Sequence, residues 1–104
     1  LVTLIAPLAA DRAKARAALS NHAFIEVFVD APLDVCEQRD VKGLYAKARR
    51  GEIAEFTGIS SPYEAPESPE VHIRTDKLTT DQAVDLVLDA LDKVLRSKAE
   101  DWEV

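Results

Sequence analysis

The chain has 104 residues, of which 47% are hydrophobic and 31% charged, an ordinary composition for one soluble globular domain. No apolar run approaches the ~20 residues that a membrane-spanning helix requires, and the single cysteine, Cys36, cannot form an internal disulfide. We therefore expect a soluble cytoplasmic protein with no membrane partner. The 19 acidic and 13 basic residues give a net charge of −6, which disfavours nucleic acid as a partner.

The first part of the chain predicts two strands and two helices. Residues 1–5 form a short apolar run, partly β-branched, which is typical of a central strand buried on both faces. Asp11 is placed to cap an alanine-rich helix that extends to about residue 19. Residues 24–30 predict a second buried strand, and Pro32 suits the first position of the helix that follows.

The second part predicts a long loop, a strand and a terminal helix. Residues 51–69 are rich in proline and show little periodicity, which predicts an irregular, solvent-facing segment. Residues 71–75 alternate and predict a short strand. Thr79 and Gln82 fit a capping box for a terminal helix that ends near residues 96–98. The apolar positions predicted to share one face of this helix are Val84, Val87, Leu88, Leu91, Val94 and Leu95.

This alternation of strands and helices indicates an α/β fold with a parallel sheet that is covered on both faces. In such sheets a ligand binds beyond the carboxyl ends of the strands. We expect those ends at Ala6, Asp30 and Thr75. All of residues 1–104 are expected to belong to one domain.

Basic residues are concentrated between residues 39 and 50, immediately before the long loop. The loop itself carries two aromatic rings, Phe56 and Tyr63. A basic run is most often a solvated helix face. Its position next to an aromatic, glycine-containing loop favours a mobile lid, from about residue 40 to residue 70, over an anionic ligand that contains a ring.

Six sequence blocks then occur in a characteristic order: residues 24–32, 36–40, 42–45, 47–49, 56–59 and 62–67. In this order they closely resemble the adenylyl-sulfate kinase (APS kinase) family, over nearly the whole chain to about residue 95. The resemblance implies a three-layer α/β/α fold of the P-loop NTPase type, of which this chain would be the C-terminal part. It also implies an enzyme that uses ATP with Mg²⁺ to phosphorylate the 3′-hydroxyl of adenosine 5′-phosphosulfate (APS).

The resemblance implies substrate-binding roles for five residues. Lys42 matches a lid lysine that contacts APS, where an ammonium suits a sulfate or phosphate oxygen. Phe56 matches the lid aromatic that covers the adenine of APS, and Glu55 beside it would contribute only its backbone. Ile5 and Ala6 match a segment whose main chain approaches the same substrate.

For ATP, the resemblance implies contacts from Arg39 at the base of the lid and from Leu78 at the adenine site. Arg12 matches the arginine of a family Asp-Arg pair, for which a ligand contact and a structural role stay equally open. The family tends to form homodimers. Fusion to, or association with, sulfate adenylyltransferase is the other partnership that the resemblance implies.

Two family features are missing from these 104 residues. The sequence has no Gly-x-x-x-x-Gly-Lys-Ser/Thr phosphate-binding loop and no Asp-Gly-Asp-Asn segment, so no catalytic residue is identifiable. Both features precede the matched region in the family order, so we expect a truncated sequence whose isolated chain is inactive. In addition, Ala6 replaces a serine that has been assigned as a phosphoryl carrier in relatives, which leaves direct transfer from ATP.

Several other residues have a plain structural interpretation. Cys36 is expected to be a small core residue, and Tyr63 a hydrophobic contact beneath the loop. His22 and His72 have no partners at metal-ligand spacing, so no metal site is predicted. Asp30 either caps the helix that begins near Pro32 or contacts a magnesium-bound water.

Three functional interpretations remain. The first is an active APS kinase, and the second is a non-catalytic, kinase-like regulatory domain that binds an adenylylated nucleotide. Lys42, Phe56 and Arg39 favour the enzyme, whereas Ala6 favours the regulatory domain. A nucleoside monophosphate kinase is a weaker third candidate, because such enzymes share the lid but lack the blocks at residues 42–45 and 56–59. The role of Trp102, which is predicted to follow the last helix, stays open.

Overall fold

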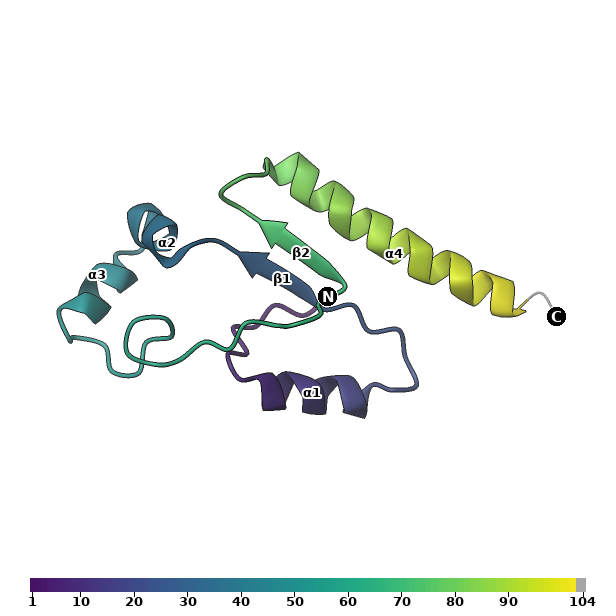
Figure 1. The fold of residues 1–104 in the computed structure, drawn as a ribbon, viewed down its shortest axis with the longest axis horizontal. Coiled ribbons are helices and arrows are strands. Elements are labelled where there is room, and N and C mark those ends of the chain that lie inside the picture. The colour runs from purple at the N-terminus through teal and green to yellow at the C-terminus, as the bar shows by residue number, and fades with distance from the viewer. Residues whose placement is uncertain (103–104) are drawn as a thin grey trace. The chain divides into compact units, whose positions relative to one another are not determined.

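The computed structural model describes the backbone of residues 1–102 and the side chains of residues 1–97. The chain divides into two compact units: unit 1 comprises Leu1–Ala18 and Ala31–Pro66, and unit 2 comprises Leu19–Asp30 and Glu67–Val104. The elements, in chain order, are α1 (Ala9–Ala18), β1 (Val27–Asp30), α2 (Leu33–Arg39), α3 (Leu44–Arg49), β2 (Val71–Arg74) and α4 (Thr80–Trp102) (Figure 1).

Unit 2 contains a parallel strand pair with one helix packed on it. β1 and β2 pair in parallel with Val27 opposite Val71 and Asp30 opposite Arg74, and α4 contacts β2 (Figure 1). Val71 and Ile73 are the buried residues of β2, at 6% and 5% exposure. The predicted α/β class with a parallel sheet is therefore confirmed, although β1 is shorter than the predicted strand at residues 24–30.

The N-terminus of α4 is fixed by the predicted capping box. The backbone N–H of Thr79 donates to Oε1 of Gln82 at 2.9 Å, and the backbone N–H of Gln82 donates to Oγ1 of Thr79 at 3.2 Å. Each residue thereby satisfies a donor that the first helical turn leaves without an internal partner. This local signal was sufficient to locate the start of the helix.

The packed face and the end of α4 differ from the prediction. Val87 and Val94 are half-buried together with Ala83 and Ala90, whereas Val84, Leu88, Leu91 and Leu95 are exposed. The predicted face is thus only partly covered by the residues that the structure describes. The helical backbone also continues through Trp102, beyond the predicted end near residues 96–98, because residues 80–102 contain no glycine or proline. The Trp102 side chain lies outside the described side chains.

In unit 1, α1 begins two residues before the predicted cap. The backbone N–H of Ala9 donates to Oε1 of Glu64 at 2.9 Å, so a glutamate 55 residues away performs the capping role. Asp11, predicted as the cap, lies in the first turn of the helix. There its negative charge still favours the helix N-terminus through the helix dipole.

The predicted strand at residues 1–5 is wrong for this structure. These residues adopt no strand, and the exposures of Val2, Leu4 and Ile5 are 78%, 80% and 71%. A buried strand requires hydrogen-bonding neighbours on a sheet and a cover on each face. Within residues 1–102 the sheet consists of β1 and β2 alone. In the same part of the chain, no helix combines the length and apolarity that crossing a bilayer requires.

We predict that the isolated 104-residue chain unfolds without a sharp cooperative transition. Among its described side chains, the buried apolar ones are Ala48, Val71 and Ile73, which is a small core for a chain of this length. Calorimetry and circular dichroism during a thermal ramp will measure the transition. A sharp melt of a monomer, with coincident calorimetric and spectroscopic curves, would contradict this expectation.

Candidate substrate-binding site

The turn between α2 and α3 presents Lys42 to solvent. Asp40 precedes the turn, and its carboxylate accepts the backbone N–H of Tyr45 at 3.0 Å and that of Ala46 at 3.1 Å. Asp40 thus caps α3, while Gly43 takes the left-handed φ of +69° that the turn requires. Lys42 is exposed in this fixed turn. Sequence reasoning missed the role of Asp40, although an aspartate before a short helical stretch is a recognised signal.

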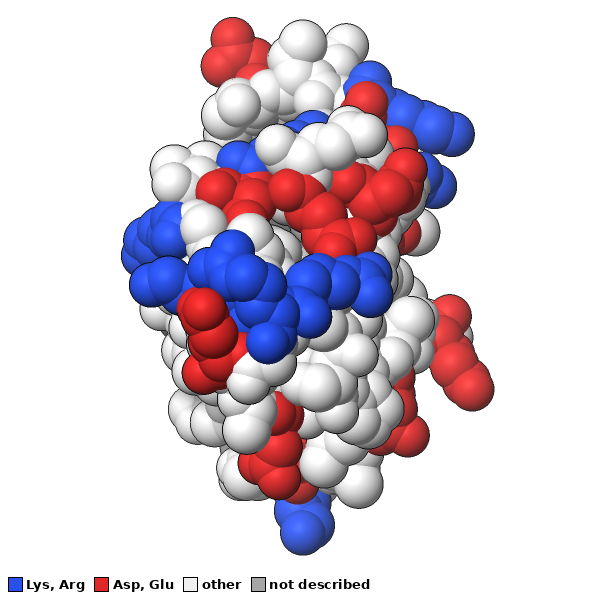
Figure 2. Space-filling view, turned by 90° about the vertical axis from the view of Figure 1, so that its left-hand side faces the viewer, with Lys and Arg blue, Asp and Glu red and all other residues white. Residues whose placement is uncertain are grey.

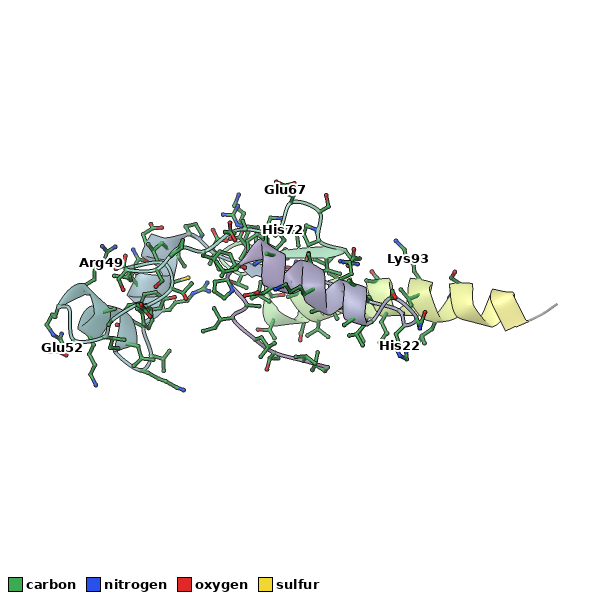
Figure 3. The ribbon with its side chains drawn as sticks, turned by 90° about the horizontal axis from the view of Figure 1, so that it is seen from below. His22, Arg49, Glu52, Glu67, His72 and Lys93 are labelled. Atoms are coloured by element: carbon green, nitrogen blue, oxygen red, sulfur yellow. The ribbon has the colours of Figure 1, made fainter. Side chains whose placement is uncertain are left out.

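The basic run is partly neutralised within the protein. Arg49 Nε donates to Glu37 Oε1 at 2.6 Å, and Arg50 Nε donates to Glu52 Oε1 at 3.1 Å. The hydrogen bond from Arg49 lowers the pKa of the Glu37 carboxyl group below its ordinary value. Figure 2 shows basic and acidic side chains side by side on the α2–α3 end, and Figure 3 labels Arg49 and Glu52 there.

Lys42 differs from these arginines. Among the described side chains, none forms a hydrogen bond or ion pair with the Lys42 ammonium group. An exposed ammonium that is not paired with a carboxylate can attract a sulfate or phosphate oxygen, and salt screens this attraction. The solvated-face interpretation therefore describes Arg49 and Arg50, whereas Lys42 keeps the charge that an anionic ligand requires.

Phe56 lies in a tight turn that is held by hydrogen bonds to its own backbone groups. Its carbonyl oxygen accepts the N–H groups of Ile59, Ser60 and Ser61 at 2.9–3.1 Å, and its N–H donates to Ser60 Oγ at 2.8 Å. Glu55, immediately before it, has a positive φ of +53°. The long loop is otherwise irregular, as predicted, apart from one bridge between Thr57 and Ser61.

The Phe56 ring packs against Tyr45 of α3. Their ring centroids are 5.0 Å apart at an interplanar angle of 73°, an edge-to-face arrangement that is favourable for aromatic pairs. Partial burial raises the pKa of the Tyr45 phenol, and the neighbouring Cys36 adds to the rise. Phe56 is half-buried, so the basic helix and the aromatic loop form one local structure. The sequence blocks contained both rings, but nothing in their spacing predicted this contact.

Ala6 and Arg12 are brought together in unit 1. Arg12 Nη1 donates to the Ala6 carbonyl at 2.6 Å, Nη2 donates to the Glu64 carbonyl, and the guanidinium lies 5.9 Å from the Tyr63 ring centroid. Ala6 has an unusual φ of +40°, and Ile5 before it is exposed. These contacts fit the structural alternative for Arg12 and the structural interpretation of Tyr63.

The two residues assigned to ATP lie in different units. Arg39 is the exposed last residue of α2 in unit 1. Leu78 lies in unit 2, in the turn before α4, where its N–H donates to the Arg74 carbonyl at 3.0 Å and its side chain is half-buried. Their joint contact with ATP therefore stays a prediction.

At the carboxyl end of the β1–β2 pair, Asp30 is engaged by residues of β2. His72 Nε2 lies 2.7 Å from Asp30 Oδ2, and Arg74 Nε lies 3.8 Å from the same oxygen. The His72 ring also stacks on Phe28, with centroids 4.8 Å apart and planes 5° from parallel. The alternative that Asp30 caps α2 is wrong, because α2 begins after Pro32 without a side-chain cap.

No metal centre is visible in the described part of the chain. Within it, no group of three or more His, Cys, Asp or Glu side chains is placed to hold a metal ion. His22 and His72, both in unit 2, lie well apart (Figure 3). Cys36 is half-buried and its Sγ lies 3.9 Å from the Ala31 carbonyl oxygen, in keeping with a packing role.

Comparison with known proteins identifies the class to which this fold belongs. The chain superimposes on 54% of the solved Mycobacterium tuberculosis APS kinase CysC, whose complex contains AMPPNP and APS, with a TM-score of 0.81 and 50% identity over 88% of this chain. The fold is therefore that of a P-loop NTPase of the kinase type. The profile of the adenylylsulphate kinase family matches residues 1–74. The chain belongs to the adenylylsulphate kinase family, and the predicted resemblance is confirmed.

Curated relatives agree with this assignment. The chain is 60% identical over 91 residues to an adenylyl-sulfate kinase of Lactiplantibacillus plantarum, covering 88% of this chain and 44% of the relative. It is 50% identical over 101 residues to the Saccharomyces cerevisiae adenylyl-sulfate kinase, covering 92% of this chain and 50% of that protein. A bifunctional CysN/CysC enzyme of Xylella fastidiosa is 54% identical over 91 residues, covering 88% of this chain and 15% of the enzyme. The chain thus spans about half the length of the adenylyl-sulfate kinases that it matches.

Proposed function

We propose that this chain forms the substrate-lid part of an adenylyl-sulfate kinase, which transfers the γ-phosphoryl group of ATP to the 3′-hydroxyl of APS. The observation that carries the proposal is the 50% identical structural neighbour, which contains both an ATP analogue and APS. The exposed Lys42 turn and the half-buried Phe56 turn support it, because together they provide a cation and a flat apolar ring on one unit.

In this proposal Lys42 binds an oxyanion of APS and Phe56 covers its adenine. Ile5 and Ala6 contribute main-chain contacts, and the positive φ of Glu55 suits a residue that contributes backbone alone. Arg39 and Leu78 are proposed to contact ATP, one through charge and the other through apolar contact with the adenine.

None of these residues is proposed to catalyse the phosphoryl transfer itself. Mg²⁺, when bound with ATP, would neutralise charge on the transferring phosphoryl group. The described side chains include no group of three or more metal ligands, so none of these residues is proposed to bind the ion. Ala6 carries a methyl group and cannot accept a phosphoryl group, so direct in-line transfer from ATP to APS is the proposed route.

We place this activity in the cytoplasm, where ATP is supplied. A homodimer is proposed as the assembly. A partnership with sulfate adenylyltransferase is also proposed, supported by the bifunctional relative from Xylella fastidiosa. Both partnerships can be measured on the complete enzyme by sedimentation and by co-purification.

A hybrid enzyme tests the proposed function. In this hybrid, residues 1–104 replace the segment of the Lactiplantibacillus plantarum relative that aligns with them. We expect ATP-dependent phosphorylation of APS and no comparable reaction with AMP or adenosine. The unmodified relative is the positive control, and the isolated 104-residue chain is expected to be inactive. A hybrid that melts at the temperature of the parent enzyme yet phosphorylates no APS would contradict the proposal.

Ala6 favours one alternative, a regulatory domain that binds APS without turnover. The alternative predicts that the folded hybrid binds APS in isothermal titration calorimetry but releases no phosphorylated product. The kinase proposal predicts both binding and product. Ala6→Ser is informative in the same assay, because a gain of activity only with serine would favour a phosphoryl relay in the parent enzyme over direct transfer.

Replacing Lys42 by alanine in the hybrid is expected to raise KM for APS about tenfold, the lower end of the ~1.5–3 kcal/mol that a hydrogen bond to a charged group contributes, because the site is exposed. The effect should shrink as ionic strength rises, since the Lys42 site is exposed and screened by salt. Initial rates at two salt concentrations provide the measurement. Lys47→Ala, on the same basic segment, is the matched control. Equal KM values for the Lys42 variant and the parent hybrid would remove Lys42 from the site.

A further inference from the structure

We propose that Arg12 is a positioning residue for the substrate site, acting through the backbone of Ala6 and through the lid loop. The inference rests on the proposed function, since it assigns Arg12 a role in APS binding. Arg12 would not contact APS itself. It would hold the Ala6 main chain and the Glu64 segment of the loop in one fixed arrangement, so that both substrate-binding segments are in place together.

The first support is the geometry of one guanidinium group. Its two terminal nitrogens donate to two carbonyl oxygens, those of Ala6 and Glu64, which lie 6 and 52 residues away in the sequence. A planar fork of fixed donors is suited to this kind of double contact, which a lysine ammonium cannot reproduce with the same geometry. The ring of Tyr63 lies under the guanidinium at 5.9 Å and adds a cation–π contact.

The second support is a pair of hydrogen bonds that do not involve Arg12. The N–H of Glu64 donates to the Pro7 carbonyl at 2.8 Å, and the Glu64 carboxylate accepts the N–H of Ala9 at 2.9 Å. The loop therefore runs along residues 6–9, and the same glutamate caps α1. All of these contacts lie within unit 1.

The third support is the backbone of Ala6. Its φ of +40° lies on the left-handed side of conformational space, which a residue with a Cβ atom rarely adopts. Such a conformation persists only where surrounding contacts impose it. The contact made to Ala6 itself is the bond from Arg12 to the Ala6 carbonyl, and the bond from the Glu64 N–H to the Pro7 carbonyl restrains the next residue. Without the bond from Arg12, the segment is expected to relax toward an extended conformation, and its main-chain groups would no longer face the substrate.

A merely structural role for Arg12 makes a different prediction. It would lower the melting temperature and affect both substrates alike. Positioning of the APS site instead raises KM for APS and leaves KM for ATP unchanged. A glycine at position 6 provides a specific test, because glycine enters the left-handed region without the cost that alanine bears.

The experiment uses the hybrid enzyme defined above. Arg12→Ala is expected to raise KM for APS by at least about tenfold, the effect of losing one hydrogen bond from a charged donor. Adding Ala6→Gly to that variant is expected to recover about fivefold of the loss, which is the lower limit of the left-handed cost for alanine. Lys14→Ala, an exposed position on the same helix, is the control and is expected to change neither KM.

Arg12→Lys applies if Arg12→Ala does not fold, because lysine keeps the positive charge but lacks the planar fork of donors that contacts the Ala6 and Glu64 carbonyls. The proposal predicts that this variant raises KM for APS and leaves KM for ATP unchanged.

Three results would overturn the proposal: an unchanged KM for APS in folded Arg12→Ala, equal increases in KM for both substrates, or a KM for APS in Arg12→Lys equal to that of the unsubstituted hybrid. Inactivity of the unsubstituted hybrid would instead count against the proposed function, so the two failures are distinguishable.

Discussion

Replacing Phe56 by alanine in the hybrid enzyme should raise KM for APS by about 5- to 150-fold, the equivalent of the ~1–3 kcal/mol that stacking of a base on an aromatic ring contributes. The ring is half-buried and packs edge-to-face with Tyr45, so part of its surface stays available to a ligand. Initial rates with varied APS at saturating ATP give the measurement. KM for ATP should not change.

The fold of the loop is expected to survive this substitution. The turn is held by hydrogen bonds to the carbonyl and N–H of Phe56, which alanine retains. Phe56→Tyr keeps the ring and is the matched control, with a KM for APS close to that of the parent hybrid. If tyrosine and alanine at position 56 give the same KM, the ring does not bind the adenine and Phe56 only packs against Tyr45.

The second large effect concerns stability. Ile73→Ala is expected to lower the free energy of unfolding of the hybrid by about 2–5 kcal/mol, because it deletes buried methyl and methylene groups and leaves a cavity. Ile73 is 5% exposed, on a strand that pairs with β1 and contacts α4. Urea unfolding, with the slope of the transition compared between variants, measures the loss.

The control for Ile73 is another aliphatic β-branched side chain. Val41 is 95% exposed, so Val41→Ala is expected to change the free energy of unfolding by no more than about 0.5 kcal/mol. Similar losses for the two variants would mean that the burial of Ile73 does not stabilise the enzyme. An Ile73→Ala variant with normal stability would contradict the assignment of β2 to the core.

Sequence reasoning succeeded where the cause of a structure lies nearby in the chain. Thr79 and Gln82 are three residues apart and form the capping box by themselves, so their pattern located α4. The alternation at residues 71–75 likewise predicted β2 to within one residue. The order of strands and helices was enough for the α/β class, because parallel strands require a connection over the sheet.

Sequence reasoning failed where the hydrogen-bonding partner of a residue lies far away in the sequence. Asp11 is the local candidate for the cap, yet the acceptor that fixes the start of α1 is Glu64, 55 residues away in the sequence. Capping of the next helix is one of the two predicted roles of Asp30, whereas its carboxylate binds His72 across the sheet. Residues 1–5 had the composition of a strand, but a strand forms only against a neighbouring strand. Such pairings depend on tertiary contacts that no local pattern contains.

The candidate site contains predicted ligand contacts and supporting residues, and sequence reasoning proposed only the former. Lys42 and Phe56 are predicted as site residues by the family resemblance, which concerns residue types in order. The residues that hold them in place, Asp40 beneath the turn and Tyr45 beside the ring, were not identified. Their roles depend on the direction in which a carboxylate or a ring points, which sequence spacing does not determine.

At position 56 the backbone holds the turn together, whereas the side chain is the part proposed to contact the ligand. Because three amides converge on its carbonyl oxygen, the bend does not depend on which side chain the residue carries. Under the role proposed for Phe56, position 56 is therefore a place to re-engineer base selectivity. On that proposal, a wider indole or a polar imidazole there would favour other nucleobases without redesign of the surrounding scaffold.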